Sequence, residues 1–185
     1  MNHLGTKTLE TERLILRKTI ESDYEYMFYN WANDERVTKY LTWHPYESAQ
    51  QLRDTYHKYL LESQEKSDFY DWKIVLKESG EPIGSIGVVR LCEEIKEAEI
   101  GYCLGFRWWH QGIMTEALRE VIRFLFDEVG CNRIMAKHDV NNPNSGAVMK
   151  NCGMLHEGTH RQAGLNMQGI CDMAVYAILK SDYEN

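Results

Sequence analysis

The sequence lacks a long apolar run, and its cysteines are not arranged for a metal site or a disulfide framework. No segment stays apolar over the roughly 18 residues that a membrane-spanning helix needs. The five cysteines are an odd number, widely spaced and without a Cys-x-x-Cys pair. This spacing argues against zinc or redox chemistry and favours reduced thiols. We therefore expect no membrane partner and no metal.

Positive charge is also scarce. The chain has 21 Lys and Arg against 28 Asp and Glu, a formal net charge of -7. A nucleic-acid surface would need clustered cations to neutralise phosphates, whereas an acidic chain suits a cationic substrate. Residues 1–12 contain neither an apolar signal core nor a basic, acid-free targeting pattern. These features predict a cytoplasmic protein that does not bind nucleic acid.

Length and composition are those of an ordinary folded chain. Its 185 residues are 43% apolar and 26% charged, and a chain of this size usually forms one core. No repeat, low-complexity tract or interdomain linker divides it. A single domain over 1–185 is the expectation.

The first half of the chain predicts one strand, two helices and a loop. An apolar and β-branched run over 8–17 is typical of a strand, and a helix follows from about Asp23, with Ser22 as its N-cap. The aromatic, proline-containing stretch 40–46 suits an ordered loop. Ser48 can cap a second helix that extends to Leu61.

The second half predicts a meander followed by alternating helices and strands. Three strand-like runs separated by polar turns indicate an antiparallel meander over 71–76, 83–92 and 98–104. Apolar residues at helical spacing then predict a helix over 113–129 that ends at Gly130. The remaining pattern predicts a strand over 133–140, a short helix over 144–151 and strands over 156–162 and 173–179. This order is that of a mixed α/β domain.

The stretch 99–118 carries the most chemical information, because it reads as a strand, a compact loop and the start of an amphipathic helix. Free backbone N–H groups and the helix dipole favour a phosphate at such a helix start, and Gly112 lets it approach closely. Gly101 and Gly105 suggest a bulge or splay in the strand. Free strand N–H and C=O groups there could pair with an extended ligand such as pantetheine.

Four segments, in order, carry a family resemblance: Leu9–Arg17, Ala98–Tyr102, Trp109–Ala117 and Asn142–Gly153. On these segments the chain resembles the GNAT superfamily of N-acyltransferases, in particular the branch of ribosomal-protein alanine and serine N-acetyltransferases. The resemblance implies a mixed α+β domain with a central, mostly antiparallel sheet of about seven strands, splayed in its middle, and helices on both faces. It also implies acetyl-CoA as co-substrate and no metal.

The generic signature of the superfamily is Arg or Gln, two residues, Gly, one residue, then Gly or Ala. Trp109 and Met114 occupy its first and last places here, so only Gly112 keeps the generic form. The resemblance implies that backbone N–H groups hold the CoA diphosphate and that Cys103 and Leu104 pair with the pantetheine arm. The diphosphate-binding residues are then His110, Gln111, Gly112, Ile113, Met114 and Thr115. Asn142 is a further cofactor-binding candidate, although turn chemistry explains it equally well.

An amine that attacks a thioester must be neutral, so the site needs a base and, for the leaving thiolate, a proton donor. Glu99 is the candidate base, because the resemblance places catalytic glutamates on this strand in some relatives. The alternative is an ion pair with a cation on a neighbouring strand. Ser145 is the candidate acid, since relatives carry a serine at this motif position. A helix N-cap is its alternative role.

The resemblance places the acceptor groove in the helix-and-loop half, which makes Trp31, Tyr40, Trp43 and His44 candidate substrate-binding residues; core packing is the alternative. His138 could be a second base or a structural histidine.

The acceptor could be a protein N-terminus or a small amine, namely a polyamine, an amino sugar or an amino acid. A non-catalytic CoA-binding domain is the alternative outside enzymes. A Rossmann-type domain is disfavoured because the glycine loop follows a meander and Gly-x-Gly-x-x-Gly is absent. A homodimer is compatible with the expected fold.

Overall fold

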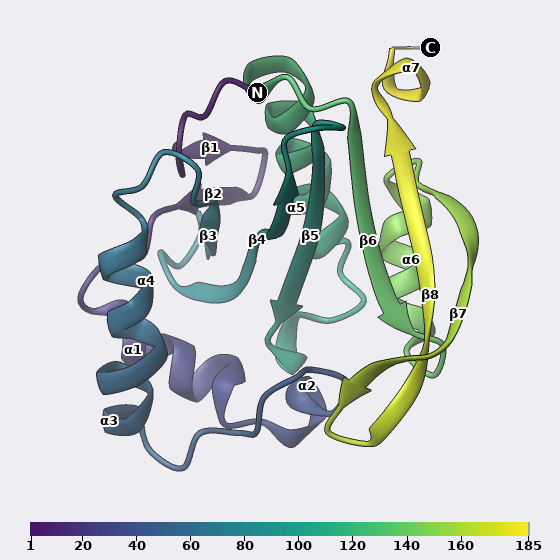
Figure 1. The fold of residues 1–185 in the computed structure, drawn as a ribbon. Helices are drawn as coiled ribbons and strands as arrows, with labels where there is room; N and C mark the ends of the chain where they lie inside the picture. The colour runs from purple at the N-terminus through teal and green to yellow at the C-terminus, as the bar shows by residue number, and fades with distance from the viewer. Residues whose placement is uncertain (185) are drawn as a thin grey trace.

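The computed structural model describes residues 1–184 of the chain. Its strands form one eight-stranded sheet in the order β1-β2-β3-β4-β5-β6-β8-β7 (Figure 1). Neighbouring strands are antiparallel except for β5 and β6, which are parallel. The strands are β1 (Leu9–Glu10), β2 (Leu14–Arg17), β3 (Asp71–Leu76), β4 (Pro82–Cys92), β5 (Glu97–Leu104), β6 (Arg133–Asp139), β7 (Leu155–Asn166) and β8 (Gly169–Leu179). The mixed, mostly antiparallel sheet predicted from the sequence is confirmed.

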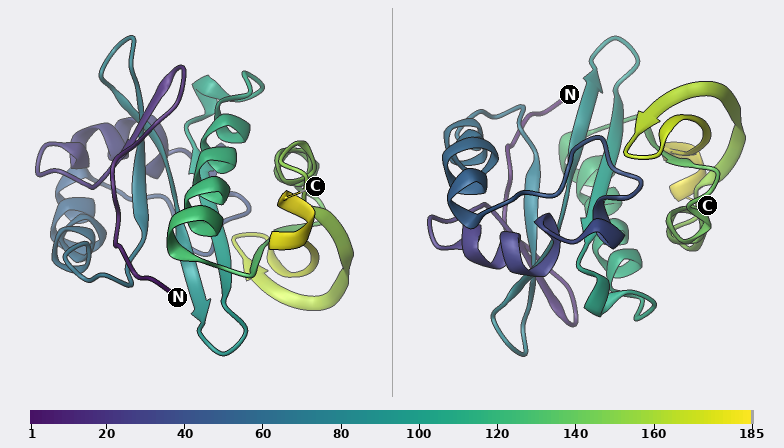
Figure 2. Two further views of the ribbon diagram at one scale, coloured as in Figure 1. Left: turned by 90° about the horizontal axis from the view of Figure 1, so that it is seen from above. Right: turned by 90° about the horizontal axis from the view of Figure 1, so that it is seen from below.

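Helices cover both faces of the sheet (Figures 1 and 2). On one face, α1 to α4 pack over β3 to β5 around a cluster that includes Met27, Leu52 and Leu60. On the other face lie α5 and α6, and α5 contributes most of its apolar side chains to the main core. The helices are α1 (Asp23–Met27), α2 (Glu35–Thr38), α3 (Ala49–Leu52), α4 (Lys58–Ser63), α5 (Ile113–Phe124), α6 (Pro143–Asn151) and α7 (Lys180–Tyr183). Single π-helical turns extend α1 over Phe28–Ala32, join α3 to α4 over Arg53–His57 and extend α5 over Leu125–Val129.

The helix that follows the glycine loop matches its sequence pattern. In α5, Ala117, Leu118 and Val121 are fully buried against the sheet, and burial of a Leu or Val side chain contributes about 1.5–3 kcal/mol. Gly130 ends the helix at φ +80°, a left-handed conformation that glycine adopts without steric cost. The helix start is thereby anchored rigidly against the sheet.

The two central parallel strands separate partway along their length. β5 pairs with β6 over only four steps, from Glu97 opposite Arg133 to Ile100 opposite Ala136. Beyond Ile100 the strands diverge toward their C-terminal ends (Figure 1). The splay expected in the middle of the sheet is therefore present. Gly101 is the first residue of β5 that no longer pairs with β6.

The structure also corrects local details of the sequence analysis. The run 8–17 forms the hairpin β1–β2 instead of one strand, and this hairpin brings the count to eight. Ser22 makes no side-chain cap; the Asp23 carboxylate accepts from the N–H of Ile20 and from Arg17 instead. Ser48 caps its helix as predicted, because its side chain accepts from the Gln51 N–H at 3.1 Å.

Candidate functional site

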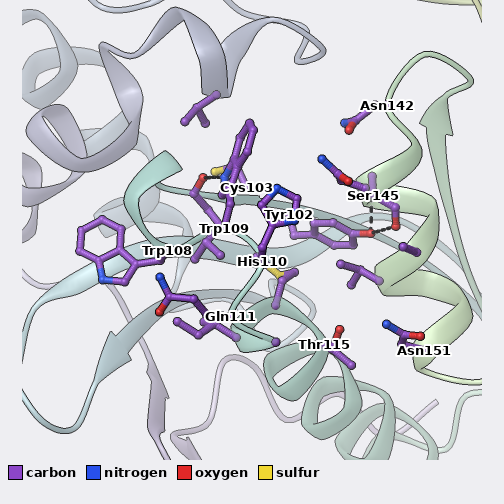
Figure 3. Close-up of a pocket in the computed structure, with 18 of the residues that line it drawn as sticks. Tyr102, Cys103, Trp108, Trp109, His110, Gln111, Thr115, Asn142, Ser145 and Asn151 are labelled. Carbon is purple, nitrogen blue, oxygen red and sulfur yellow. Dashed lines mark hydrogen bonds between the residues drawn. The ribbon is translucent and has the colours of Figure 1, made fainter.

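A cavity of about 340 Å³ opens at the splay, between the start of α5 and the start of α6 (Figure 3). The end of β5, the loop into α5, the first turn of α5 and one side of α6, from its N-cap to Asn151, form its walls. Val37 and Leu41, from α2 and the residues after it, add apolar surface at the opposite side. The cavity therefore combines an apolar interior with two helix N-termini.

The loop at the cavity floor presents a run of free backbone donors. Among residues 1–184, no group accepts a hydrogen bond from the backbone N–H groups of the six residues from His110 to Thr115. His110 and Gly112 have left-handed backbones, at φ 58° and 73°. Free amides at the start of a 12-residue helix suit a phosphate group. A ligand that carries a diphosphate and a narrow apolar arm fits this cavity.

The other predicted cofactor residues also line the cavity. Cys103 and Leu104 lie at the end of β5. Thr115 lies in the first turn of α5 and Asn142 at the N-cap of α6 (Figure 3). Burial raises the pKa of the Cys103 thiol to about 12, so this side chain is a neutral apolar surface at physiological pH. The structure thus brings together all nine residues proposed for the cofactor.

Ser145 projects into the same cavity from the first turn of α6 and contacts Tyr102 (Figure 3). The Tyr102 hydroxyl donates to the Ser145 carbonyl oxygen at 3.0 Å and lies 3.0 Å from the Ser145 hydroxyl. Burial raises the pKa of Tyr102, so it remains protonated at neutral pH. Ser145 is not the N-cap of α6, because Asn142 holds that position. The Ser145 side chain therefore does not cap the helix, and its hydroxyl contacts Tyr102 at the cavity.

Glu99 lies outside this cavity, on the face of β5 turned away from α5. Its neighbours Ala98 and Ile100 pack into the α5 side of the core, so alternation along the strand turns Glu99 to the face away from α5. One carboxylate oxygen pairs with Lys137 Nζ at 3.0 Å and the other with Arg90 Nε at 3.2 Å. Glu99 opposes Met135 on β6, one step before the strands separate. It is thus beside the splay, and cations hold both of its oxygens.

A second cavity of about 490 Å³ lies beside Glu99. Its walls carry an ion-pair ladder built from residues of β4, β5, β6 and β7, in which Arg133 joins Glu97 to Glu157 and Arg90 joins Glu97 to Glu99. The three acidic groups are matched by Arg90, Arg133 and Lys137. Because these charges neutralise one another, the ladder does not call for a charged ligand.

The four predicted acceptor residues lie outside the cavity at the splay and differ in exposure. Trp31 is only 2% exposed and packs in the α1–α4 cluster, so it is a core residue instead of a groove wall. Trp43 is half-buried, packs against the same cluster and contacts Tyr46 at a ring separation of 5.8 Å. Tyr40 is half-buried and His44 is exposed. None of these four residues lines the cavity at the splay.

His138 is buried under α6 and lies outside both cavities. Its Nδ1 lies 2.7 Å from the Asp139 carbonyl oxygen, which makes Nδ1 the protonated nitrogen. Its Nε2 has no hydrogen-bond partner within residues 1–184 and faces Gly146 of α6. This placement supports the structural role for His138.

Sequence reasoning did not assign Tyr102 a chemical contact, nor Val37 and Leu41 a place at the cavity. Tyr102 belongs to the strand motif, and period-2 alternation places its side chain on the same face of the strand as Leu104, a predicted cofactor residue. Val37 and Leu41 reach the cavity only through tertiary packing, which no local pattern signals.

Comparison with known proteins decides the family. A family model described as "Acetyltransferase (GNAT) domain" matches residues 13–155. The chain belongs to the GNAT acetyltransferase family. It is 32% identical over 180 residues to the N-acetyltransferase p20 of Bacillus licheniformis, covering 96% of this chain and 98% of that protein. It is 34% identical over 104 residues to the ribosomal-protein-serine acetyltransferase of Escherichia coli, covering 56% and 58%.

Solved structures share the GNAT fold. A GNAT-family acetyltransferase from Bacillus anthracis superposes with a TM-score of 0.82 at 23% identity, covering 95% of this chain and 99% of that one. The ribosomal-protein-S5-alanine acetyltransferase of Vibrio fischeri gives 0.83 at 18% identity, with 97% and 100% covered. The acetyltransferase MccE, solved with acetyl-CoA and AMP, gives 0.80 at 20% identity, with 91% and 93% covered.

The family membership makes this GNAT protein an acyltransferase, an N-acetyltransferase that uses acetyl-CoA. Within residues 1–184, no helix has the length and apolar character to cross a membrane. The same residues contain no group of three or more His, Cys, Asp and Glu side chains that could hold a metal ion.

Proposed function

We propose that this GNAT enzyme acetylates the N-terminal amine of a protein, with its donor bound in the cavity at the splay. The observation that carries the proposal is the run of six free backbone N–H groups in a cavity that also holds Ser145. Two relatives support the acceptor class, since one is named for a ribosomal-protein serine and another for a ribosomal-protein alanine. Five free cysteines suit a reducing cytoplasm.

The protein contributes alignment and proton transfer to the reaction. The amine nitrogen forms a bond to the acetyl carbon while the carbon–sulfur bond breaks, so the amine loses a proton and the thiolate gains one. Ser145 is the proposed proton donor to sulfur, and Tyr102, 3.0 Å away, can return a proton to it. An acceptor that enters from the face opposite α5 meets Glu99, the proposed base.

Glu99 can act only by giving up an ion pair. Both of its oxygens contact cations, so a proton taken directly or through a water replaces the contact to Lys137 or Arg90. Lys137 is the more readily displaced partner, because within residues 1–184 it pairs with Glu99 alone, whereas Arg90 also pairs with Glu97.

The direct test incubates the protein with acetyl-CoA and three acceptors, followed by mass spectrometry of the products. The first acceptor is a peptide with a free N-terminal serine and no lysine. The second is a peptide with a blocked N-terminus and one internal lysine, and the third is a polyamine. We expect acetylation of the first peptide alone. Acetylation of the polyamine instead would refute the acceptor class, and donor binding without transfer to any acceptor would favour a non-catalytic domain.

The variant Glu99→Gln tests the proposed base. We expect kcat to fall by about 10²- to 10⁴-fold, because the amide cannot accept the proton. An acceptor amine of lower pKa should recover part of the rate, since more of it is already neutral. A variant that loses thermal stability but keeps the kcat of the native protein would show that Glu99 serves only the ion-pair ladder.

A further inference from the structure

The turn before β2 is fastened to the first turn of α5 through Arg13 and Glu116. The backbone N–H of Arg13 donates to Glu116 Oε1 at 2.9 Å, and its Nε donates to Glu116 Oε2 at 2.7 Å. The Thr11 hydroxyl also donates to Glu116, at 2.5 Å. These three bonds place the Arg13 guanidinium directly beside the loop that leads into α5.

The rest of the guanidinium reaches that loop at a single peptide group. Arg13 Nη1 donates to the carbonyl oxygen of Gln111 at 3.0 Å. Its Nη2 lies 3.7 Å from where a Cβ on Gly112 would stand. Arg13 does not line the cavity, so it contacts this peptide from outside the proposed ligand site.

The orientation of one half of a peptide fixes the other half. In a planar trans peptide, the C=O of Gln111 and the N–H of Gly112 point in opposite directions. The bond from Arg13 to the carbonyl oxygen therefore turns the Gly112 N–H away from Arg13, toward the cavity, where it has no partner within residues 1–184. We propose that Arg13 is a positioning residue for the acyl donor: it holds the Gln111–Gly112 peptide with its N–H facing the diphosphate.

The loop needs a hydrogen bond that fixes the Gln111–Gly112 peptide, because glycine leaves the backbone at position 112 free to rotate. Gly112 sits at φ +73° and carries no Cβ, so rotation of the preceding peptide meets little steric resistance. A rotated peptide would present the Gln111 carbonyl oxygen to the phosphate oxygens, which exchanges an attractive dipole for a repulsive one. Trp109 and Met114, which replace the generic signature residues, make no hydrogen bond to this peptide within the described chain.

Arg13 acts through hydrogen-bond geometry more than through charge. Glu116 pairs with it at 2.7 Å and offsets its positive charge locally. Lysine keeps the charge but has one compact ammonium group, which cannot span Glu116 and the Gln111 carbonyl oxygen as the planar guanidinium does. Arg13→Lys should therefore behave like Arg13→Met, an outcome that a simple charge effect does not produce.

The test compares donors with and without a diphosphate, and it rests on the proposed placement of that group. Calorimetric titration with acetyl-CoA and with S-acetylpantetheine is done on the native protein, Arg13→Met and Arg13→Lys. We expect both variants to bind acetyl-CoA about 10- to 100-fold more weakly, the effect of one hydrogen bond to a charged group. S-acetylpantetheine, which lacks the diphosphate, should bind all three proteins equally. The KM for acetyl-CoA should rise while kcat at saturation is retained.

Two controls separate the possible failures. Arg107→Met removes an exposed cation from the same loop without touching the Gln111 carbonyl oxygen, and it should bind acetyl-CoA like the native protein. Gly112→Glu places a carboxylate at the proposed diphosphate site and should abolish binding. Native-like affinity in Arg13→Met, an equal loss for both donors, or rescue by lysine would overturn the role of Arg13. Native-like affinity in Gly112→Glu would instead overturn the placement of the donor.

Discussion

The pair formed by Ser145 and Tyr102 is where single side chains bear most directly on the reaction. Both hydroxyl groups lie in the cavity, 3.0 Å apart. For Ser145→Ala we expect kcat to fall roughly 100-fold, because the thiolate would leave without its donor. The KM for acetyl-CoA should change little, since the free amides of the α5 loop remain.

Tyr102→Phe serves as the matched variant. Steady-state kinetics of the two single variants, Tyr102→Phe and Ser145→Ala, are compared. Tyr102→Phe removes the second hydroxyl but keeps the ring, so we expect a smaller loss of kcat than in Ser145→Ala. If Tyr102→Phe is the more damaged enzyme, then Tyr102 is the donor and Ser145 only orients it.

Cys103 predicts a dependence of stability on pH. Its pKa is raised to about 12 by burial, against about 8.5 for an ordinary thiol. Between these values the unfolded chain loses a proton that the folded chain retains, so stability is fully present below about pH 8.5 and falls as pH rises. The loss from one such thiol is at most about 1.4 kcal/mol per pH unit.

Urea denaturation at about pH 7.5 and about pH 10 measures this effect. Cys103→Ala should lose less stability between the two conditions than the native protein does. Cys152→Ala is a second case, because burial raises its pKa to about 12 as well. Identical pH dependence in the native and Cys103→Ala proteins would contradict the assignment.

At the scale of elements, α6 depends on a close approach to β6. A Cβ on Gly146 would stand 2.5 Å from His138 Nε2, closer than non-bonded atoms come. Gly146→Ala should therefore destabilise the protein by about 1–3 kcal/mol, the usual cost of overpacking, and shift Ser145 at the cavity. Urea denaturation gives the first quantity. The double variant with His138→Ala should recover part of the loss, whereas additive losses would place the strain elsewhere.

The elements that local patterns specify were predicted well from the sequence. The helix over 113–129 was predicted because its apolar residues repeat at helical spacing and Gly130 ends it. The hairpin β1–β2 was missed because its turn, Thr11 to Arg13, contains no glycine or proline. The final strands were placed correctly but made too short, since β7 and β8 extend to Asn166 and from Gly169 as one long hairpin.

In the candidate site, too, residues of one contiguous segment were predicted well, and contacts between separate elements were not. The α5 loop is contiguous in sequence, so its cofactor residues came together as expected. The partners of Glu99 lie on β4 and β6, and only strand register brings Arg90 and Lys137 to it. Trp31 looked like a groove residue because nothing local reveals that Leu52 and Leu60 pack in the same cluster. Contacts between elements, which decide these cases, are not encoded in any one segment.

At the scale of the whole molecule, the donor site lies where the two central parallel strands separate. β5 and β6 share only four paired steps, and the cavity beyond them is bounded by α5 from one side and α6 from the other. A ligand that contacts both helix starts binds the folded chain and not the unfolded one. Stability must then rise with ligand concentration, by about 2.7 kcal/mol at a hundred times Kd.

For a chain of this length, that increment corresponds to a rise in Tm of roughly 5–10 °C. Thermal unfolding followed against acetyl-CoA concentration measures it, and hydrogen exchange shows where it arises. The amides of His110 to Thr115 have no acceptor within the described chain, so they should exchange rapidly in the free protein and slow when the donor binds. Gly112→Glu should show neither change. A Tm shift without protection of these six amides would mean that acetyl-CoA binds elsewhere on the fold.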